Sequence, residues 1–204
     1  MSKEVEISRR DLLRTIGISL SLTATGADLI TAEAAQHVHH MVRQAKTAKG
    51  PYQPKLLTAH EYDTLRKLLD LILPADERSQ GAVHAGAPEF IDFLCSANDD
   101  LAAVYTGGLA WLDREMTSRY KSTFVAAQPD QQTALLDLIA YRKNESPELN
   151  PGITFFAWAR NMTADAFYTS KIGMDDLGFM GNGAVSSFSV PVEAVQYAVK
   201  RSGL

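Results

Sequence analysis

Three histidines near the start of the chain, His37, His39 and His40, are the residues that most readily suggest chemistry. Imidazole nitrogens are common metal ligands, so clustered histidines can indicate a metal site. No cysteine and no set of acidic ligands accompanies them, and the stretch that holds them ends in a glycine and two prolines. We therefore expect residues 35–56 to form a solvated, flexible tether, which in a multi-subunit protein could lie across a partner.

Acidic side chains offer a second possibility, because Asp165, Asp175 and Asp176 could together bind a cation. Their spacing does not match the calcium-binding loop of an EF-hand, and solvated loop carboxylates are the simpler interpretation. Two further histidines, His60 and His84, lie far apart in sequence. We expect His60 to be exposed, because it falls in the first turn of a capped helix.

Candidate nucleophiles lack the surroundings that would activate them. Cys95 is the single cysteine, which excludes an internal disulfide, and its apolar neighbours indicate a small buried side chain. Ser186 and Ser187 are not in a G-x-S-x-G elbow. The sequence has no P-loop, no HExxH, no CxxC and no haem-attachment motif. We therefore assign no catalytic, cofactor-binding or metal-binding residue to this chain.

The most informative motif is Ser8-Arg9-Arg10-Asp11-Leu12-Leu13-Arg14. Two arginines followed by leucines at the apolar positions are typical of a twin-arginine (Tat) signal, which exports proteins that have already folded. Arg9, Arg10, Leu12 and Leu13 carry the motif. This pattern predicts export to the periplasm.

The residues after the arginines agree with a Tat signal. The run from Ile16 to Ile30 is diluted by glycine, serine and threonine and includes Asp28, so it is too short and too polar for a stable membrane span. Ala32-Glu33-Ala34 offers a small-x-small cleavage site, which sets the predicted signal segment at residues 1–34. The alternative is an amphipathic N-terminal helix of a cytoplasmic protein.

Composition limits the classes of protein that are possible. The chain has 204 residues, which suffice for one domain, and 46% of them are hydrophobic. The formal charge of −4 is opposite to the basic face that binds nucleic acid. We expect no nucleic-acid partner.

Helix signals recur along residues 57–204, and no alternating strand pattern or repeat appears. Thr58 and Glu61 form a capping box, and Pro74 should end the helix that they begin. Gly107 and Gly108 within a later helix suggest a kink or a close helix crossing. The remaining start signals are Pro88, Asp99 or Asp100, Pro129, Asn150 with Pro151, and Pro191. The predicted fold is a single all-α domain of about five to six packed helices.

A long irregular, glycine-rich segment interrupts this pattern at residues 168–183. Its large apolar side chains have no helical period, so they should either pack on the core or contact a partner. The predicted partner interface comprises Tyr168, Ile172, Gly173, Leu177, Gly178, Phe179, Met180 and Gly181.

Three segments, in this order and spacing, resemble the gluconate 2-dehydrogenase subunit 3 family, the small (gamma) subunit of FAD-dependent sugar dehydrogenases. They are Leu57-Thr58-Ala59-His60-Glu61 through Leu71-Ile72-Leu73-Pro74-Ala75-Asp76, then Ala85-Gly86-Ala87-Pro88-Glu89-Phe90-Ile91-Asp92, and Phe167-Tyr168-Thr169-Ser170 with Gly173 and Leu177-Gly178-Phe179-Met180-Gly181-Asn182. The resemblance covers most of residues 57–183, and the twin-arginine start is typical of the family.

The resemblance implies a division of labour. A larger flavoprotein of the GMC oxidoreductase type would bind FAD and oxidise a sugar hydroxyl, and a cytochrome c often accepts the electrons. The small subunit would stabilise the flavoprotein and carry the export signal for both. The runner-up hypothesis is a free-standing exported helical protein that binds a ligand or catalyses a reaction at its own site.

Overall fold

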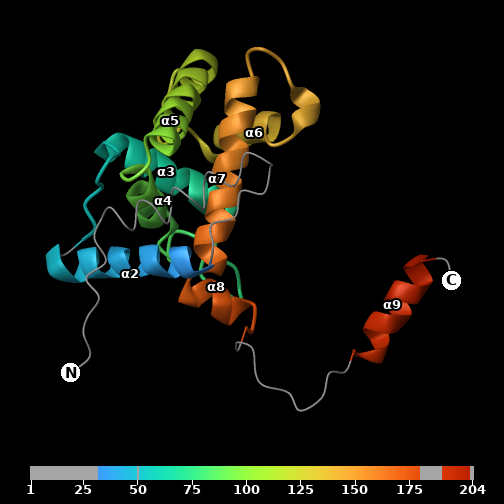
Figure 1. The fold of residues 1–204 in the computed structure, drawn as a ribbon. Coiled ribbons are helices and arrows are strands. Elements are labelled where there is room, and N and C mark those ends of the chain that lie inside the picture. The colour runs from blue at the N-terminus through green and yellow to red at the C-terminus, as the bar shows by residue number, and fades with distance from the viewer. Residues whose placement is uncertain (1–31, 50, 180–189, 203–204) are drawn as a thin grey trace.

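The computed structural model describes residues 32–49, 51–179 and 190–202, and within these ranges every regular element is a helix. The predicted all-α class is therefore confirmed (Figure 1). The elements are α2 (Ala32–Lys49), α3 (Ala59–Ile72), α4 (Ala87–Cys95), α5 (Asp99–Tyr120), α6 (Pro129–Ile139), the 3₁₀ turn η2 (Arg142–Asn144), α7 (Asn150–Tyr168), α8 (Lys171–Asp176) and α9 (Val192–Ser202).

Helix α7 is the centre of the domain, as its aromatic and apolar sequence suggests. It packs against α3, α4, α5, α6 and α8. Its crossing with α5 occurs at Gly108, where an added Cβ would lie 2.0 Å from the Phe155 ring. Tyr105 of α5 packs edge-on against the same ring, with 5.7 Å between the ring centroids. The close crossing predicted from the glycine pair is confirmed.

Local signals explain most helix boundaries. Thr58 and Glu61 form both hydrogen bonds of the capping box at the start of α3. At α5 the cap is Asn98, whose side chain accepts a hydrogen bond from the Leu101 amide, rather than Asp99 or Asp100. Each of these caps satisfies backbone amides that have no partner within the helix.

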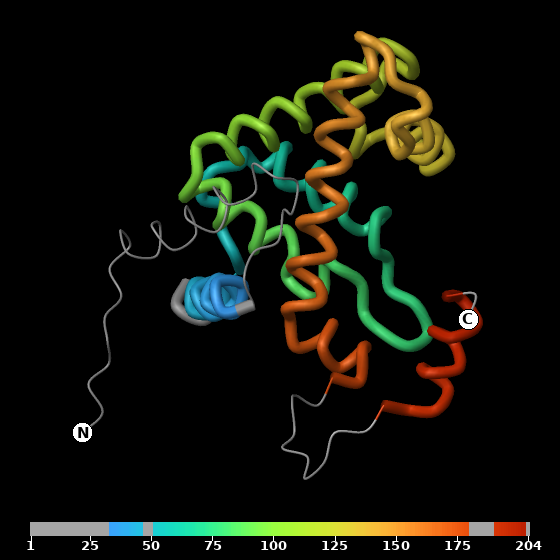
Figure 2. The backbone as a smooth tube through the Cα atoms, turned by 45° about the vertical axis from the view of Figure 1, so that its right-hand side comes forward, coloured from blue at the N-terminus to red at the C-terminus, as the bar shows by residue number. Residues whose placement is uncertain are grey.

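The predicted tether over residues 35–56 is wrong for most of its length. Helix α2 occupies Ala32–Lys49 and packs on α4 through one buried face that includes Ala35, Val38 and Val42. These residues follow the i, i+3, i+7 spacing of an amphipathic helix. In Figure 1 α2 lies below α4, with one end beside the lower end of α7, and in Figure 2 it is seen end-on.

The predicted irregular segment at residues 168–183 is also partly helical. Ser170 caps the short helix α8, and its hydroxyl accepts a hydrogen bond from the Gly173 amide. Gly173 is buried there. Its backbone lies so close to the end of α7 that an added Cβ would be 2.1 Å from the Phe167 carbonyl oxygen. Gly178 then adopts a φ of 62°, a left-handed conformation that glycine takes without strain. Met180 and Gly181 lie outside the described residues.

The buried carboxylate of Asp92 connects α4 to the segment that precedes α3. It accepts hydrogen bonds from the backbone amides of Lys55 (2.6 Å), Leu56 (3.2 Å) and Leu57 (3.0 Å). The Tyr52 hydroxyl donates a fourth bond at 2.8 Å. Burial, followed by the charge of Asp92, raises the pKa of Tyr52, so this hydroxyl remains a donor at neutral pH. Asp92 thus holds Tyr52 and residues 55–57, which precede α3, against α4.

We predict that Asp92→Ala lowers the free energy of unfolding by at least about 3 kcal/mol, because four donors lose their acceptor. Tyr52→Phe removes only one of these bonds and should cost about 1 kcal/mol. Urea denaturation followed by circular dichroism measures both values. Equal losses in the two variants would show that the three backbone bonds contribute little.

The glycine pair of α5 gives a second, matched prediction. Gly108→Ala should destabilise the domain by about 1–3 kcal/mol, because the added methyl group must displace Phe155. Gly107→Ala meets no atom within 4 Å and should instead stabilise the helix by about 0.5–1 kcal/mol. Thermal unfolding of the two variants distinguishes these effects, and a stabilising Gly108→Ala would refute the close crossing.

Candidate partner-docking site

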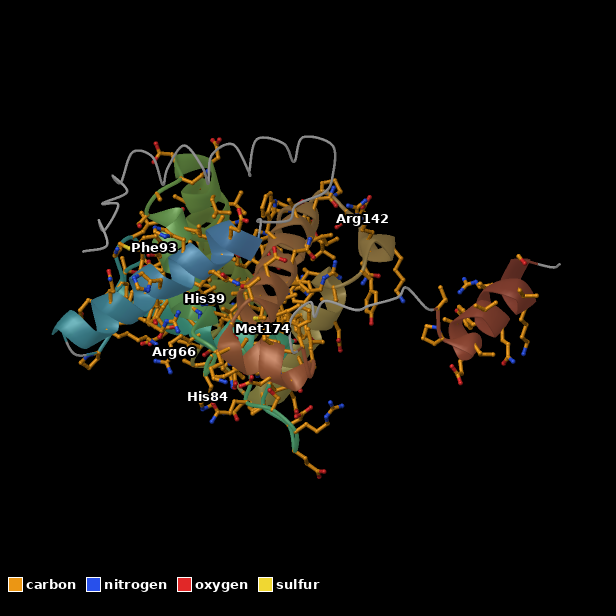
Figure 3. All side chains as sticks on the ribbon, turned by 60° about the horizontal axis from the view of Figure 1, so that its bottom comes forward. His39, Arg66, His84, Phe93, Arg142 and Met174 are labelled. Atoms are coloured by element: carbon orange, nitrogen blue, oxygen red, sulfur yellow. The ribbon has the colours of Figure 1, made fainter. Side chains whose placement is uncertain are left out.

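A cleft of about 630 Å³ lies between α2, the loop before α4 and α8. Figure 3 labels one residue from each of its three walls: His39 on α2, His84 on the loop and Met174 on α8. The residues that line the cleft are Gln36, His39, Val42, Arg43, Lys46, His84, Ala85, Gly86, Thr169, Ser170, Lys171, Ile172, Met174, Asp175 and Phe179. Two of these, Ile172 and Phe179, belong to the predicted partner interface.

His39 joins the α2 wall to the α7–α8 wall. Its ring stacks in a tilted arrangement on Phe90, with 4.8 Å between the ring centroids. Its Nε2 lies 3.0 Å from the Thr169 hydroxyl oxygen. That hydroxyl donates its own hydrogen to the Asp165 carbonyl, so it accepts from His39, and Nε2 carries the proton. Because His39 is part of the docking contact of α2, it is not available as a metal ligand in this arrangement.

The cleft is more basic than the chain as a whole. Arg43, Lys46 and Lys171 line it, whereas Asp175 is its only carboxylate among the described residues. Lys46 pairs with Glu89 at 2.7 Å, and the Glu89 side chain is mostly buried. Lys171 pairs with Asp175 at 2.6 Å, and both of these side chains are exposed. Exposed ion pairs contribute little to stability, so Lys171 can exchange partners readily. The charge pattern favours an acidic or polar surface as the binding partner.

Large apolar side chains stand exposed along the α8 edge of the cleft. Leu177 is 61% exposed, Phe179 is 51% exposed and Tyr168 is 41% exposed. All three belong to the predicted interface and lie at the end of α7 or just after α8, and Ile172 of the same predicted interface is half-buried. Apolar side chains grouped at the surface in this way are typical of a protein contact. Gly178 is exposed beside them.

Other candidate residues are placed differently. The export motif, Arg9, Arg10, Leu12 and Leu13, lies outside the described residues. Gly173 is buried against α7, so it contributes to packing rather than to an exposed surface.

The other side chains that were considered for chemistry, Cys95 and His60, are a buried residue and a surface residue with a partner. Cys95 is buried, as predicted, and its burial raises the pKa of the thiol, which leaves it protonated and unreactive. His60 is exposed and contacts Asp113. Over the described part of the chain, no three His, Cys, Asp or Glu side chains are grouped so that they could hold a metal ion.

Sequence reasoning missed the structural roles of two residues: Asp92, which binds the segment before α3, and His39, which lines the cleft. The sequence does contain a signal for Asp92, because it is an acid within an apolar run. Burying its carboxylate costs free energy unless hydrogen-bond donors contact it, so donors are to be expected. His39 had no such signal, since its partners Phe90 and Thr169 come from distant parts of the chain.

The fold and the cleft define an all-α domain with a partly apolar, partly basic surface suited to a protein contact. Residues 59–186 match the family described as gluconate 2-dehydrogenase subunit 3, and the chain belongs to this family. Helix α2 and helix α9 lie outside the matched residues. Neither a search of curated proteins nor a search of solved structures found a match. Among the described residues, no helix has the length and hydrophobicity needed to span a membrane.

His39 makes the stability of the domain sensitive to acid. Burial, and then the charge of Arg43, lower its pKa below the ordinary value of 6.5, although a hydrogen bond to the Ala166 carbonyl opposes the shift. The unfolded chain therefore binds a proton at higher pH than the folded chain does. It follows that the stability contributed by neutral His39 is complete above pH 6.5 and is lost as the pH falls through the lowered pKa.

We predict that His39→Gln flattens the dependence of unfolding free energy on pH between about pH 7 and about pH 5. His40→Gln, on the exposed face of the same helix, should keep the wild-type slope. Urea denaturation at a series of pH values measures the three slopes. Identical slopes for wild type and His39→Gln would show that His39 does not titrate with folding.

Proposed function

We propose that this chain is the non-catalytic small subunit of a periplasmic FAD-dependent sugar or glycoside dehydrogenase. In this role it binds and stabilises a GMC-type flavoprotein and escorts it through Tat export. The family to which the chain belongs is named for the third subunit of a dehydrogenase, which implies a catalytic partner. The observation that carries the proposal furthest is the exposed apolar edge formed by Tyr168, Leu177 and Phe179 within the family-matched residues.

The division of labour accounts for the chemistry of this chain. The flavoprotein would hold FAD and oxidise the sugar hydroxyl, and a cytochrome c could accept the electrons. FAD loads onto a folded protein in the cytoplasm, so the loaded partner would have to cross the membrane folded, as Tat substrates do. One signal on the small subunit would then serve both chains, and the complex could associate with the membrane through its other subunits.

The proposal predicts a yellow complex. The tagged chain, purified from the periplasm of its native cell, should co-purify with a flavoprotein of the GMC type and show flavin absorbance. Changing both Arg9 and Arg10 to Lys should leave the partner in the cytoplasm, as measured by its distribution between cell fractions. A colourless chain that carries no flavoprotein would overturn the proposal.

The surface of contact can be tested in the same preparation. Leu177→Asp combined with Phe179→Asp should reduce the recovered flavoprotein by at least about tenfold, because it puts charges into an apolar contact. Tyr141→Asp is the control, since Tyr141 is also exposed but belongs to the loop after α6. Equal losses in both variants would show that the contact lies elsewhere.

A second candidate function is a free-standing exported protein that binds its own ligand. It is favoured by a polar cavity of about 750 Å³ between α6, η2 and α7, whose lining includes Arg142, Trp158 and Arg160. Figure 3 labels Arg142 at this side of the domain. This function predicts a monodisperse chain without flavoprotein that binds small anions or sugars, and calorimetric titration of the purified chain distinguishes the two.

A further inference from the structure

The small residues of the predicted cleavage site lie inside a folded helix. Helix α2 begins at Ala32, so the Ala32-Glu33-Ala34 sequence forms its first turn. Ala34 is 4% exposed and Ala35 is fully buried. The bond that a signal peptidase would cut therefore joins two residues that pack against the core.

The first turn of α2 belongs to the same packed face as the rest of the helix. Val38 and Val42 continue this face one and two turns further on, and both are buried. The His39 contacts with Phe90 and Thr169 hold the middle of the helix, and the Lys46–Glu89 pair holds its later part. Opening the first turn would expose Ala34 and Ala35 and strain this continuous contact.

Helix packing also explains why alanines occupy the first turn of α2. Small side chains let one helix approach its neighbour closely, and α2 is packed directly against α4. Alanine is in addition the best helix former, which favours a helix over an extended strand at this point. The same residues that resemble a peptidase recognition site thus serve the close approach of two helices.

A peptidase needs its substrate as an accessible, extended segment, and cutting concentrates at exposed, weakly packed sites. A Tat substrate folds before it crosses the membrane, so the peptidase would meet α2 already docked. We infer that the bond after Ala34 is protected by the fold and that the exported chain keeps residues 1–34. This inference rests on the proposed Tat export. It makes the N-terminal segment a permanent part of the mature subunit rather than a discarded signal.

The first test is the intact mass and N-terminal sequence of the chain recovered from the periplasm with its complex. We expect a chain that retains the residues before Ala35. A mature N-terminus at Ala35 or within two residues of it would overturn the inference, even if the flavoprotein is present and the proposed function stands.

The second test needs neither export nor a partner. Purified full-length chain is incubated with signal peptidase, folded or kept unfolded in urea, alongside a susceptible reporter protein that verifies peptidase activity. The folded chain should be cut at least about tenfold more slowly than the unfolded chain, because cutting requires local opening. Equal rates, including no cutting of either form, would overturn protection by the fold.

A matched pair of variants locates the protection. Val38→Asp places a charge in the buried face of α2 and should raise the cutting rate toward that of the unfolded chain. Gln36→Asp introduces the same charge on the exposed face and should leave the rate unchanged. If Val38→Asp is cut as slowly as Gln36→Asp, docking of α2 is not what protects the bond.

Discussion

The hydrogen bonds to Asp92 are the constraint on which the rest of this domain depends. A carboxylate without exposed surface is tolerated only where donors replace its water, and here three backbone amides and the Tyr52 hydroxyl do so. Those donors all come from the segment between α2 and α3. The interaction therefore ties the segment that precedes α3 to α4.

The candidate docking surface is formed in part by α2. Helix α2 packs on α4 and forms one wall of the cleft, with α8 opposite. His39 spans the gap between the two walls, so the shape of the cleft and the position of α2 are linked. Binding of a partner at α8 would therefore depend on whether α2 is docked. Docking of α2 in turn determines whether the bond after Ala34 is accessible.

The buried ionisable groups of the described residues contribute to the packing of the domain. Tyr105 and Cys95 are buried groups whose pKa is raised by burial, and neither lines the cleft or the cavity described above. Most of the exposed large apolar side chains among the described residues lie at the end of α7, just after α8, and on or just before α9, whose residues are all exposed. Exposed apolar side chains of this kind are typical of a surface that contacts another protein.

The sequence by itself determined the all-α class, the capping box at Thr58, the helix that starts at Pro129 and the close crossing at Gly108, because these depend on local backbone chemistry or on one small residue. Only the tertiary structure decided the docking of α2 and the role of Asp92. The alanines and histidines of α2 are only weakly hydrophobic, so the sequence alone is equally consistent with a tether. The residues that His39 contacts, Phe90 and Thr169, belong to distant parts of the chain. A buried acid likewise shows its donors only after the chain has folded around it. Local signals can place helix ends, but the free energy that docks a helix comes from surfaces that distant segments supply.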